Sequence, residues 1–285
     1  DLGLPAGGGS SAFNLDPTIK REVIWAGPQL RPAALLADRR AGVVRLRDAS
    51  GSWHQPHQGL SDFDSVVSEL ADPQSAPEVM ALRERIRSWR FYDHFRTVQH
   101  SPARLAQLGT RTPVLSHDGA DVAAAIATIG EVGDVGALHE AIDNAFPGAR
   151  LEIVNQGGRF DLALHQRGLL RPLAGAELSD GTLRYLLWVA ALLTPRPPEL
   201  LVLNEPETSL HPDLLPALAA LIVQAAQRCQ VVVVSHSQPL VHSIEGGSND
   251  VHLDLGAIQL EKEFGRTAVA GKGRFDGPAW TWPQR

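Results

Sequence analysis

Two short apolar runs, each followed by polar residues of catalytic or ligand-binding type, constrain the fold of this chain most strongly. The first run covers 200–203 and is followed by Asn204 and Glu205, and the second covers 231–234 and precedes His236 by one residue. Two buried strands with a helical segment between them indicate a parallel α/β sheet. In such sheets the chemistry gathers beyond the carboxyl ends of the strands. We therefore expect these polar residues to belong to one functional region.

A small polar turn precedes both runs and opens a helix. Ser179 stands where a helix N-cap is expected, and Gly181 lets the backbone approach another group closely. The free amides and the positive end of the helix dipole at such a turn can grip a phosphate group. Alone, the turn would indicate an ordinary N-cap; the motifs downstream of it favour phosphate binding.

These stretches, in this order and spacing, resemble the C-terminal lobe of an ABC-type ATPase head. The branch is that of RecF, SMC and OLD-like proteins, which are grouped with predicted AAA-family ATPases. The matching segments are 178–182 for the ABC signature, 200–205 for a Walker B strand with its glutamate, 209–212 for the D-loop and His236 for the switch histidine. The sequence EPETSLHP, where transporters typically have DEPTSALD, indicates the RecF/OLD branch.

The resemblance implies a fold and a division of the chain. The fold is α/β, a P-loop NTPase of the ABC-ATPase head type, with a mostly parallel sheet flanked by helices, antiparallel N-terminal strands and a helical insert. Residues 1–60 would be the remnant of an N-terminal antiparallel β lobe, and 61–148 the helical insert. Residues 149–285 would be the C-terminal ATPase lobe, with the signature, Walker B, D-loop and switch histidine.

The resemblance also implies the chemistry. Two chains would sandwich two ATP molecules with Mg²⁺, and the signature of each chain would cap the nucleotide of the other. Glu205 would polarise the attacking water, and His236 would contact the γ-phosphate or that water. Nucleotide contacts are implied for eight further residues, namely Leu178, Ser179, Asp180, Gly181 and Thr182 of the signature and Ser209, Leu210 and His211 of the D-loop.

Two residues depart from the family pattern. Asn204 stands where the family has an aspartate that holds the magnesium shell through water, so an acceptor oxygen remains while the charge is lost. We expect either weaker Mg²⁺ binding at Asn204 or help from another carboxylate, for which Glu207 is the candidate. Asp180 replaces a glycine and places an acid near a polyphosphate, which predicts weaker nucleotide binding.

The remaining sequence predicts further elements. Strands are expected over 21–26 and 42–47, the latter in a hairpin that returns through Trp53, and a second hairpin over 150–154 and 159–165. Helices are expected over 62–70, 76–95, 116–129, 136–146, 179–193, 212–228 and after His236 to Ile244. Closing strands are expected over 251–255, 258–263 and 267–270.

Charge and composition limit the partners. The net charge of −6 and the pI near 6.0 argue against a surface built as a whole to attract nucleic acid, although a local basic face stays open. The expected helix over 76–95 carries Arg83, Arg85, Arg87 and Arg90. They form either a nucleic-acid face or, as we favour, a solvated face paired with Glu78 and Glu84.

The compartment is expected to be the cytoplasm. A single cysteine, Cys229, excludes an intramolecular disulfide and fits a reducing environment. No apolar run approaches the roughly 20 residues that a membrane-spanning helix needs, so no membrane association is predicted. The expected partners are ATP, a second copy of the chain on ATP binding, and DNA or a partner protein on which closure would act.

Two other functions stay open. One is a non-hydrolysing interaction module with the same fold, and the other is an ATPase subunit of an ABC transporter. A phosphate loop encoded upstream of Asp1 would support the enzyme over the module. A neighbouring permease gene would favour the transporter, against which the SLHP wording and the missing membrane segment argue.

No phosphate loop of the form G-x-x-x-x-G-K-[ST] occurs in the 285 residues. Gly271-Lys272 is followed by Gly273, and no lysine follows the glycines at 7–9. We expect the phosphate loop to lie in a preceding segment, the alternative being a degenerate ATPase. These 285 residues alone should then be inactive, because signature contacts leave the β-phosphate unheld.

Isothermal calorimetry tests this expectation. Titration of these 285 residues with ATP and Mg²⁺ should show no saturable site at low-micromolar nucleotide. A tight site would mean that the phosphates are held by residues other than those of the family pattern.

Overall fold

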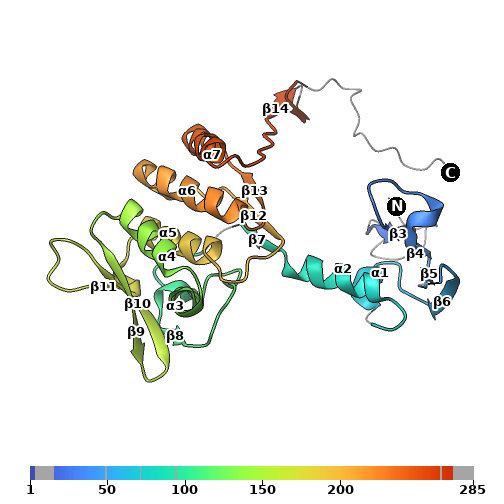
Figure 1. Cartoon of the computed structure of the whole chain (residues 1–285), viewed down its shortest axis with the longest axis horizontal. Coiled ribbons are helices and arrows are strands. Elements are labelled where there is room, and N and C mark those ends of the chain that lie inside the picture. The colour runs from blue at the N-terminus through green and yellow to red at the C-terminus, as the bar shows by residue number, and fades with distance from the viewer. Residues whose placement is uncertain (4–15, 49, 71, 94, 264, 272–285) are drawn as a thin grey trace. The chain divides into compact units, whose positions relative to one another are not determined.

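The computed structural model describes residues 1–3, 16–48, 50–70, 72–93, 95–263 and 265–271. The glycines at 7–9, Lys272 and the C-terminal tail lie outside them. Two compact units are present, one of residues 1–91 with 198–201 and one of 92–197 with 202–285. Figure 1 labels the elements of both. The three domains predicted from the sequence remain a prediction beside this division.

The first unit is built on an antiparallel sheet. Its strands lie in the order β3-β4-β5-β6, with bounds Arg21–Trp25, Leu35–Arg40, Val43–Arg47 and Trp53–Gln58. The strands expected near 21–26 and 42–47, and the hairpin through Trp53, are therefore confirmed. A short pair, β1 (Leu2–Gly3) with β2 (Thr18–Ile19), and a 3-10 turn, η1 (Pro32–Ala34), complete the β part of this unit.

One face of this sheet forms the core of the first unit. Ala37, Val44 and Leu46 are buried there. They cluster with residues of helices α1 (Val66–Glu69) and α2 (Pro77–Ser88), among them Val66 and Val79. Because side chains alternate along a strand, the residues between them face the other side of the sheet.

The helices of the first unit are shorter than the sequence predicts. The helix expected over 62–70 begins only at Val66, whose amide donates to the Glu22 carboxylate at 2.9 Å. The helix expected over 76–95 ends at Ser88, and strand β7 (Arg90–Tyr92) follows it. The aromatic residues of that strand favour an extended backbone, and the apolar spacing hid this change of structure.

The second unit is organised around helix α5 (Asp180–Leu192). Every residue from Leu183 to Leu192 is buried, as in a core helix. In Figure 1, α4 and α6 lie beside it, with α7 next to α6. The other elements are β8 (Gln107–Leu108), α3 (Val122–Val132), α4 (Val135–Ala145), β11 (Leu173–Ala174), α6 (Leu215–Ala226) and α7 (Gln238–Asp250), with 3-10 turns η2 (Pro102–Arg104), η3 (Gly175–Glu177) and η4 (Pro212–Leu214).

A β hairpin of the second unit matches the sequence prediction. Strands β9 (Arg150–Gln156) and β10 (Arg159–His165) pair antiparallel across Gly157 and Gly158. Both glycines have positive φ, 60° and 83°, which a two-residue hairpin turn of this kind requires. The last hairpin joins β14 (Leu260–Glu263) and β15 (Arg266–Val269), whereas the strand expected at 251–255 is absent from these residues.

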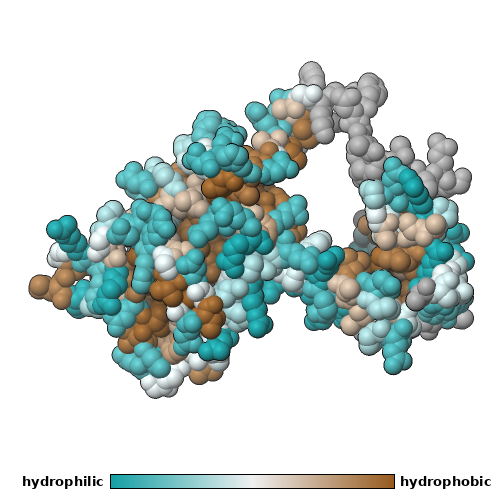
Figure 2. Space-filling model, in the orientation of Figure 1, coloured by the Kyte–Doolittle hydropathy of each residue, from teal (hydrophilic) through white to brown (hydrophobic). Residues whose placement is uncertain are grey.

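The sheet that carries the polar strand ends has three strands in the order β13-β12-β7, with β12 at Leu200–Asn204 and β13 at Gln230–Val234. Its parallel part and the antiparallel strands elsewhere confirm the predicted fold class. Figure 2 shows hydrophobic side chains at the surface near these strands. Val232 and Val234 of β13 are exposed. Among the described residues, no helix combines the length and apolar character that a bilayer crossing demands.

Candidate functional site

Glu205 and His236 meet at the carboxyl ends of neighbouring strands. The Glu205 Oε1 atom lies 3.4 Å from Nε2 of His236. The strand ends that carry them are joined as well, because the Glu205 amide donates to the carbonyl of Val234, two residues before His236, at 2.8 Å. A carboxylate and an imidazole this close contact each other directly, and because both are exposed they can both bind one water molecule on their solvent side.

The loop from Glu205 to Ser209 has an unusual backbone. Both of these residues have positive φ, 45° and 63°, although neither is a glycine. Such conformations cost free energy and persist where the surroundings enforce them. Buried side chains of α5 do so here: the Trp188 indole donates to the Pro206 carbonyl at 3.0 Å, and the Arg184 guanidinium to that of Thr208 at 3.1 Å.

Arg184 also joins a third segment to α5 and the loop. Its second Nη donates to the Phe95 carbonyl at 3.0 Å, so one side chain joins α5, the 205–209 loop and the segment after β7. Burial lowers the pKa of Arg184, and the nearby Asp180 charge counteracts that shift. A guanidinium nevertheless stays protonated at neutral pH.

Glu207 organises the turn that carries His236. Its Oε1 accepts from the Ser235 hydroxyl at 2.7 Å and from the amides of His236 and Ser237 at 3.0 and 3.1 Å. A carboxylate that accepts several hydrogen bonds holds such a turn in one shape. The other oxygen, Oε2, is buried and has no partner among the described residues. Glu207 is thus engaged with the turn after β13.

Asn204 lies next to a different carboxylate. Its Nδ2 donates to Oδ1 of Asp93 at 2.5 Å, at the end of β7. The arrangement explains why an amide suits position 204, since an aspartate there would face Asp93 with a like charge. It also puts a carboxylate beside an amide oxygen, which are the ligand types that Mg²⁺ accepts.

The residues present fit a magnesium ion that takes one or two ligands from the protein and the others from water and phosphates. Among the described residues, no three His, Cys, Asp or Glu side chains are grouped to hold a metal. Mg²⁺ is commonly bound by one or two protein ligands together with water and substrate phosphates. Asn204 and Asp93 are the residues that would hold it.

The signature turn is built as the sequence indicates. The Ser179 hydroxyl caps α5 by accepting from the Thr182 amide at 3.1 Å. A Cβ on Gly181 would lie only 2.9 Å from the Ser209 carbonyl oxygen, so glycine is required for this close approach. The turn therefore packs directly on the D-loop backbone.

A buried arginine supports the turn from below. Arg104 donates to the Leu178 carbonyl at 2.5 Å and to Oδ1 of Asp180 at 2.6 Å. This gives Asp180 a cationic partner. The positive charge of Arg104 offsets the negative charge that was expected to weaken nucleotide binding. Leu178 itself is buried.

An exposed ion pair stabilises the segment that precedes the signature turn. Arg171 binds both oxygens of Glu177 at 2.7 Å. That pair, with the Ala174 amide, lowers the pKa of Glu177 to about 2. Because the folded pKa is depressed, this contribution to stability is present above the ordinary carboxyl range and is lost as the pH falls toward 2.

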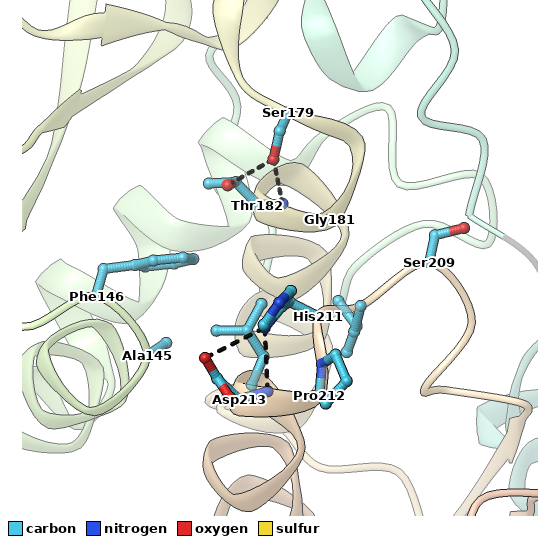
Figure 3. Close-up of a pocket in the computed structure, with 11 residues that line it drawn as sticks. Ala145, Phe146, Ser179, Gly181, Thr182, Ser209, His211, Pro212 and Asp213 are labelled. Carbon is cyan, nitrogen blue, oxygen red and sulfur yellow. Dashed lines mark hydrogen bonds and ion pairs between the residues drawn. The ribbon is translucent and has the colours of Figure 1, made fainter.

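An open cavity of about 610 Å³ is lined by the signature turn and the D-loop on one side and by the end of α4. Figure 3 shows its lining, which comprises Ser179, Gly181 and Thr182, residues 209–214, and Ala145 with Phe146 from the end of α4. In this view His211 is joined to Asp213, its Nδ1 lying 3.3 Å from the carboxylate.

The structure thus sorts the predicted residues into two groups. Glu205, His236 and Asn204 lie at the strand ends. Six others line the cavity, namely Ser179, Gly181, Thr182, Ser209, Leu210 and His211. Leu178 and Asp180 are absent from that lining. Sequence reasoning missed Asp93, Phe146 and Arg104, and only Asp93, at the end of an aromatic strand, carried a signal.

The family model for "AAA domain, putative AbiEii toxin, Type IV TA system" matches residues 49–243 of the chain. The chain belongs to this AAA family. The match covers the strand ends, the signature turn and the D-loop, and it gives this AAA domain the general character of an ATPase. A search of curated proteins finds no match.

Solved structures similar to this AAA domain include SMC ATPases and SMC head domains. One, from work on ATP-driven dimerization and DNA stimulated activation of SMC ATPases, is 13% identical with a TM-score of 0.40 and covers 50% of this chain and 84% of its own. The SMC head domain from Thermotoga maritima is also 13% identical with a TM-score of 0.37, covering 87% and 72%. An SmcHead bound to the C-winged helix domain of ScpA is 10% identical with a TM-score of 0.44, covering 82% and 67%.

The AAA domain spans only part of two longer SMC structures, 27% of one from Pyrococcus yayanosii and 35% of one from Pyrococcus furiosus. At these identities and scores the likenesses bear on no function.

Replacing Asn204 tests the pairing with Asp93. Asn204→Asp places two carboxylates in contact, so without divalent cation the melting temperature should fall by about 2–4 °C, corresponding to about 1 kcal/mol. Millimolar Mg²⁺ should reverse the loss by binding between them. The double variant Asp93→Asn/Asn204→Asp, which moves the carboxylate to the other strand, is the control and should melt like the parent. If Mg²⁺ does not change the melting temperature of Asn204→Asp, residue 204 does not contact the ion.

Hydrogen exchange tests the role of Glu207. Glu207→Ala removes the acceptor, so the amides of His236 and Ser237 should exchange at least about tenfold faster, since bonds to a charged acceptor contribute ~1.5–3 kcal/mol. Glu207→Gln keeps an acceptor oxygen, so its exchange rates at these amides should lie between those of the parent and of Glu207→Ala. Glu140→Ala, an exposed glutamate on α4, is the matched control. Unchanged protection in Glu207→Ala would show that the turn holds its shape without this carboxylate.

Proposed function

We propose that the chain is part of an ATPase head that binds and hydrolyses ATP between two copies of itself. One observation carries the proposal: the Glu205–His236 pair and the signature cavity are separate groups of residues in one unit. A chain that supplied one complete site alone would bring them together. Two chains placed face to face can each complete the site of the other.

Glu205 and His236 would perform the hydrolytic step. The Glu205 carboxylate accepts a proton from the attacking water, and the ring nitrogen of His236 orients that water or binds the γ-phosphate. Their positions follow from the 205–209 loop and from the turn that Glu207 holds. Mg²⁺, when bound beside Asn204 and Asp93, would neutralise charge on the phosphates.

The signature turn would serve the nucleotide of the other chain. Ser179, Gly181 and Thr182 at the N-terminus of α5 line the cavity, where the positive end of the helix dipole can bind a phosphate. Gly181 and Ser209 touch, so the turn and the D-loop would meet the second chain as one surface. Leu178, Leu210 and His211 would help to shape that surface, and Asp180 would act through Arg104.

Closure of the two chains would do work on DNA or on a partner protein in repair, recombination or defence. The name of the family, with its toxin–antitoxin context, supports the defence role. The cytoplasm is the compartment we propose, in keeping with the single cysteine.

Two alternatives make different predictions. A non-hydrolysing interaction module would carry no phosphate loop in the complete protein, and sequencing upstream of Asp1 decides this. An ATPase subunit of a transporter would be encoded beside a permease and would co-purify with it.

Glu205→Gln in the complete protein tests the hydrolytic step. The amide keeps the size and the hydrogen-bonding reach of the side chain but cannot take up the proton. Hydrolysis should fall by about 10²–10⁴-fold, the usual worth of a general base, while ATP still binds. Glu140→Gln on α4 is the matched control and should hydrolyse at the parent rate. Parent-level hydrolysis in Glu205→Gln would remove Glu205 from the mechanism.

The same variant tests dimerisation. Uncleaved ATP should hold two copies of Glu205→Gln together, giving a dimer by light scattering with ATP and a monomer without it. Adding Ser179→Arg should abolish the dimer by blocking the turn, whereas adding Ser179→Ala, which loses the same helix cap, should retain it. A Glu205→Gln protein that binds ATP but stays monomeric would contradict the composite site.

A further inference from the structure

The outer face of the first unit's sheet carries a cluster of arginines around one buried carboxylate. The Asp38 carboxylate contacts Arg21 and Arg45 at 3.1 Å and Arg40 at 3.4 Å. Asp38 is paired in register with Arg45 on the next strand and lies between the core residue Ala37 and Arg39. Alternation along the strand therefore places this cluster on the face opposite to the core.

The cluster carries more positive charge than it neutralises. The Asp38 side chain is 4% exposed, whereas those of Arg21, Arg45 and Arg40 are 36%, 46% and 65% exposed. Three positive charges against one negative charge leave an excess of two at the surface. The guanidinium groups of this set, which we call the arginine face, can thus reach an anionic partner.

The arginines of α2 are arranged differently. Arg85 lies 3.1 Å from Glu199, and Arg87 lies 3.8 Å from Glu84. Each of these two has a carboxylate of its own, as expected of a solvated helix surface. The excess positive charge is thus a property of the sheet and not of every arginine in this unit.

Aromatic surface accompanies the arginine face. The Arg45 guanidinium lies 5.5 Å from the ring centroid of Trp53 on the neighbouring strand, a cation–π distance. Trp53 is 40% exposed, and Trp25 at the end of β3 is 41% exposed. A half-exposed tryptophan beside an exposed arginine, as Trp53 is beside Arg45, can stack on a base while the cation binds a phosphate.

We propose that the arginine face, together with Trp53, binds single-stranded nucleic acid. The guanidinium groups would contact the phosphates, and the Trp53 ring would stack on an unpaired base. A duplex hides its base faces within the stack, so it could use only the charges. The proposal does not rest on ATP hydrolysis, and it gives the first unit a function separate from the site on the second.

Fluorescence anisotropy with a labelled oligothymidylate of about 20 nucleotides tests the proposal without any nucleotide present. The parent should bind in low salt, with affinity that falls as salt rises. Trp53→Ala should weaken binding by roughly 5- to 150-fold at an unchanged salt slope, since stacking is insensitive to ions. Arg40→Ala should weaken binding and reduce the salt slope by about 0.7, the loss of one phosphate contact.

Controls separate this face from other sources of binding. The double variant Arg85→Ala/Arg87→Ala on α2 should bind like the parent, and a duplex of the same length should bind more weakly. Trp53→Phe, which keeps a ring, should retain most of the affinity and stands in if Trp53→Ala does not fold.

Three results would overturn the proposal. The first is a parent that does not bind the oligonucleotide. The second is equal binding by the parent, the folded tryptophan variant and Arg40→Ala. The third is equal loss in the α2 variant, which would indicate charge without a site. Each result leaves the ATPase proposal untouched, because the assay contains no ATP.

Discussion

The candidate site depends on hydrogen bonds that a buried helix donates to the backbone of one loop. Trp188 and Arg184 bind the carbonyls of Pro206 and Thr208 and so hold the two residues with positive φ, Glu205 and Ser209. These bonds come from the same helix that the signature turn opens. A single rigid element therefore sets the positions of the proposed base and of the proposed phosphate-binding turn.

The loop also connects the two groups of site residues in sequence. Glu205 faces His236, Glu207 holds the turn that carries His236, and Ser209 packs on Gly181 of the signature turn. Only three residues lie between Glu205, which makes the first contact, and Ser209, which makes the last. In the pair of chains that we propose, phosphate binding at one signature turn would thus be coupled, through this loop, to the Glu205–His236 pair of the same chain.

Sequence reasoning located this region because strand ends, caps and motif order are local properties. It placed Glu205, His236 and Ser179 on the correct elements, as well as the hairpin at 150–165. It missed Asp93 and Arg104, whose partners lie far along the chain and are brought near by packing. It also ran α2 into β7, because three-to-four apolar spacing continues through Trp89 while the backbone changes to an extended form.

The contact between Asn204 and Asp93 has a consequence for how such chains diverge. A carboxylate needed near one strand end can be carried by the neighbouring strand, provided that the first position gives up its own charge. The two positions should then change together among descendants of a common ancestor, acid and amide exchanging places. A search that scores each motif by its usual residue would record a missing carboxylate at position 204, although the neighbouring strand places that of Asp93 beside it.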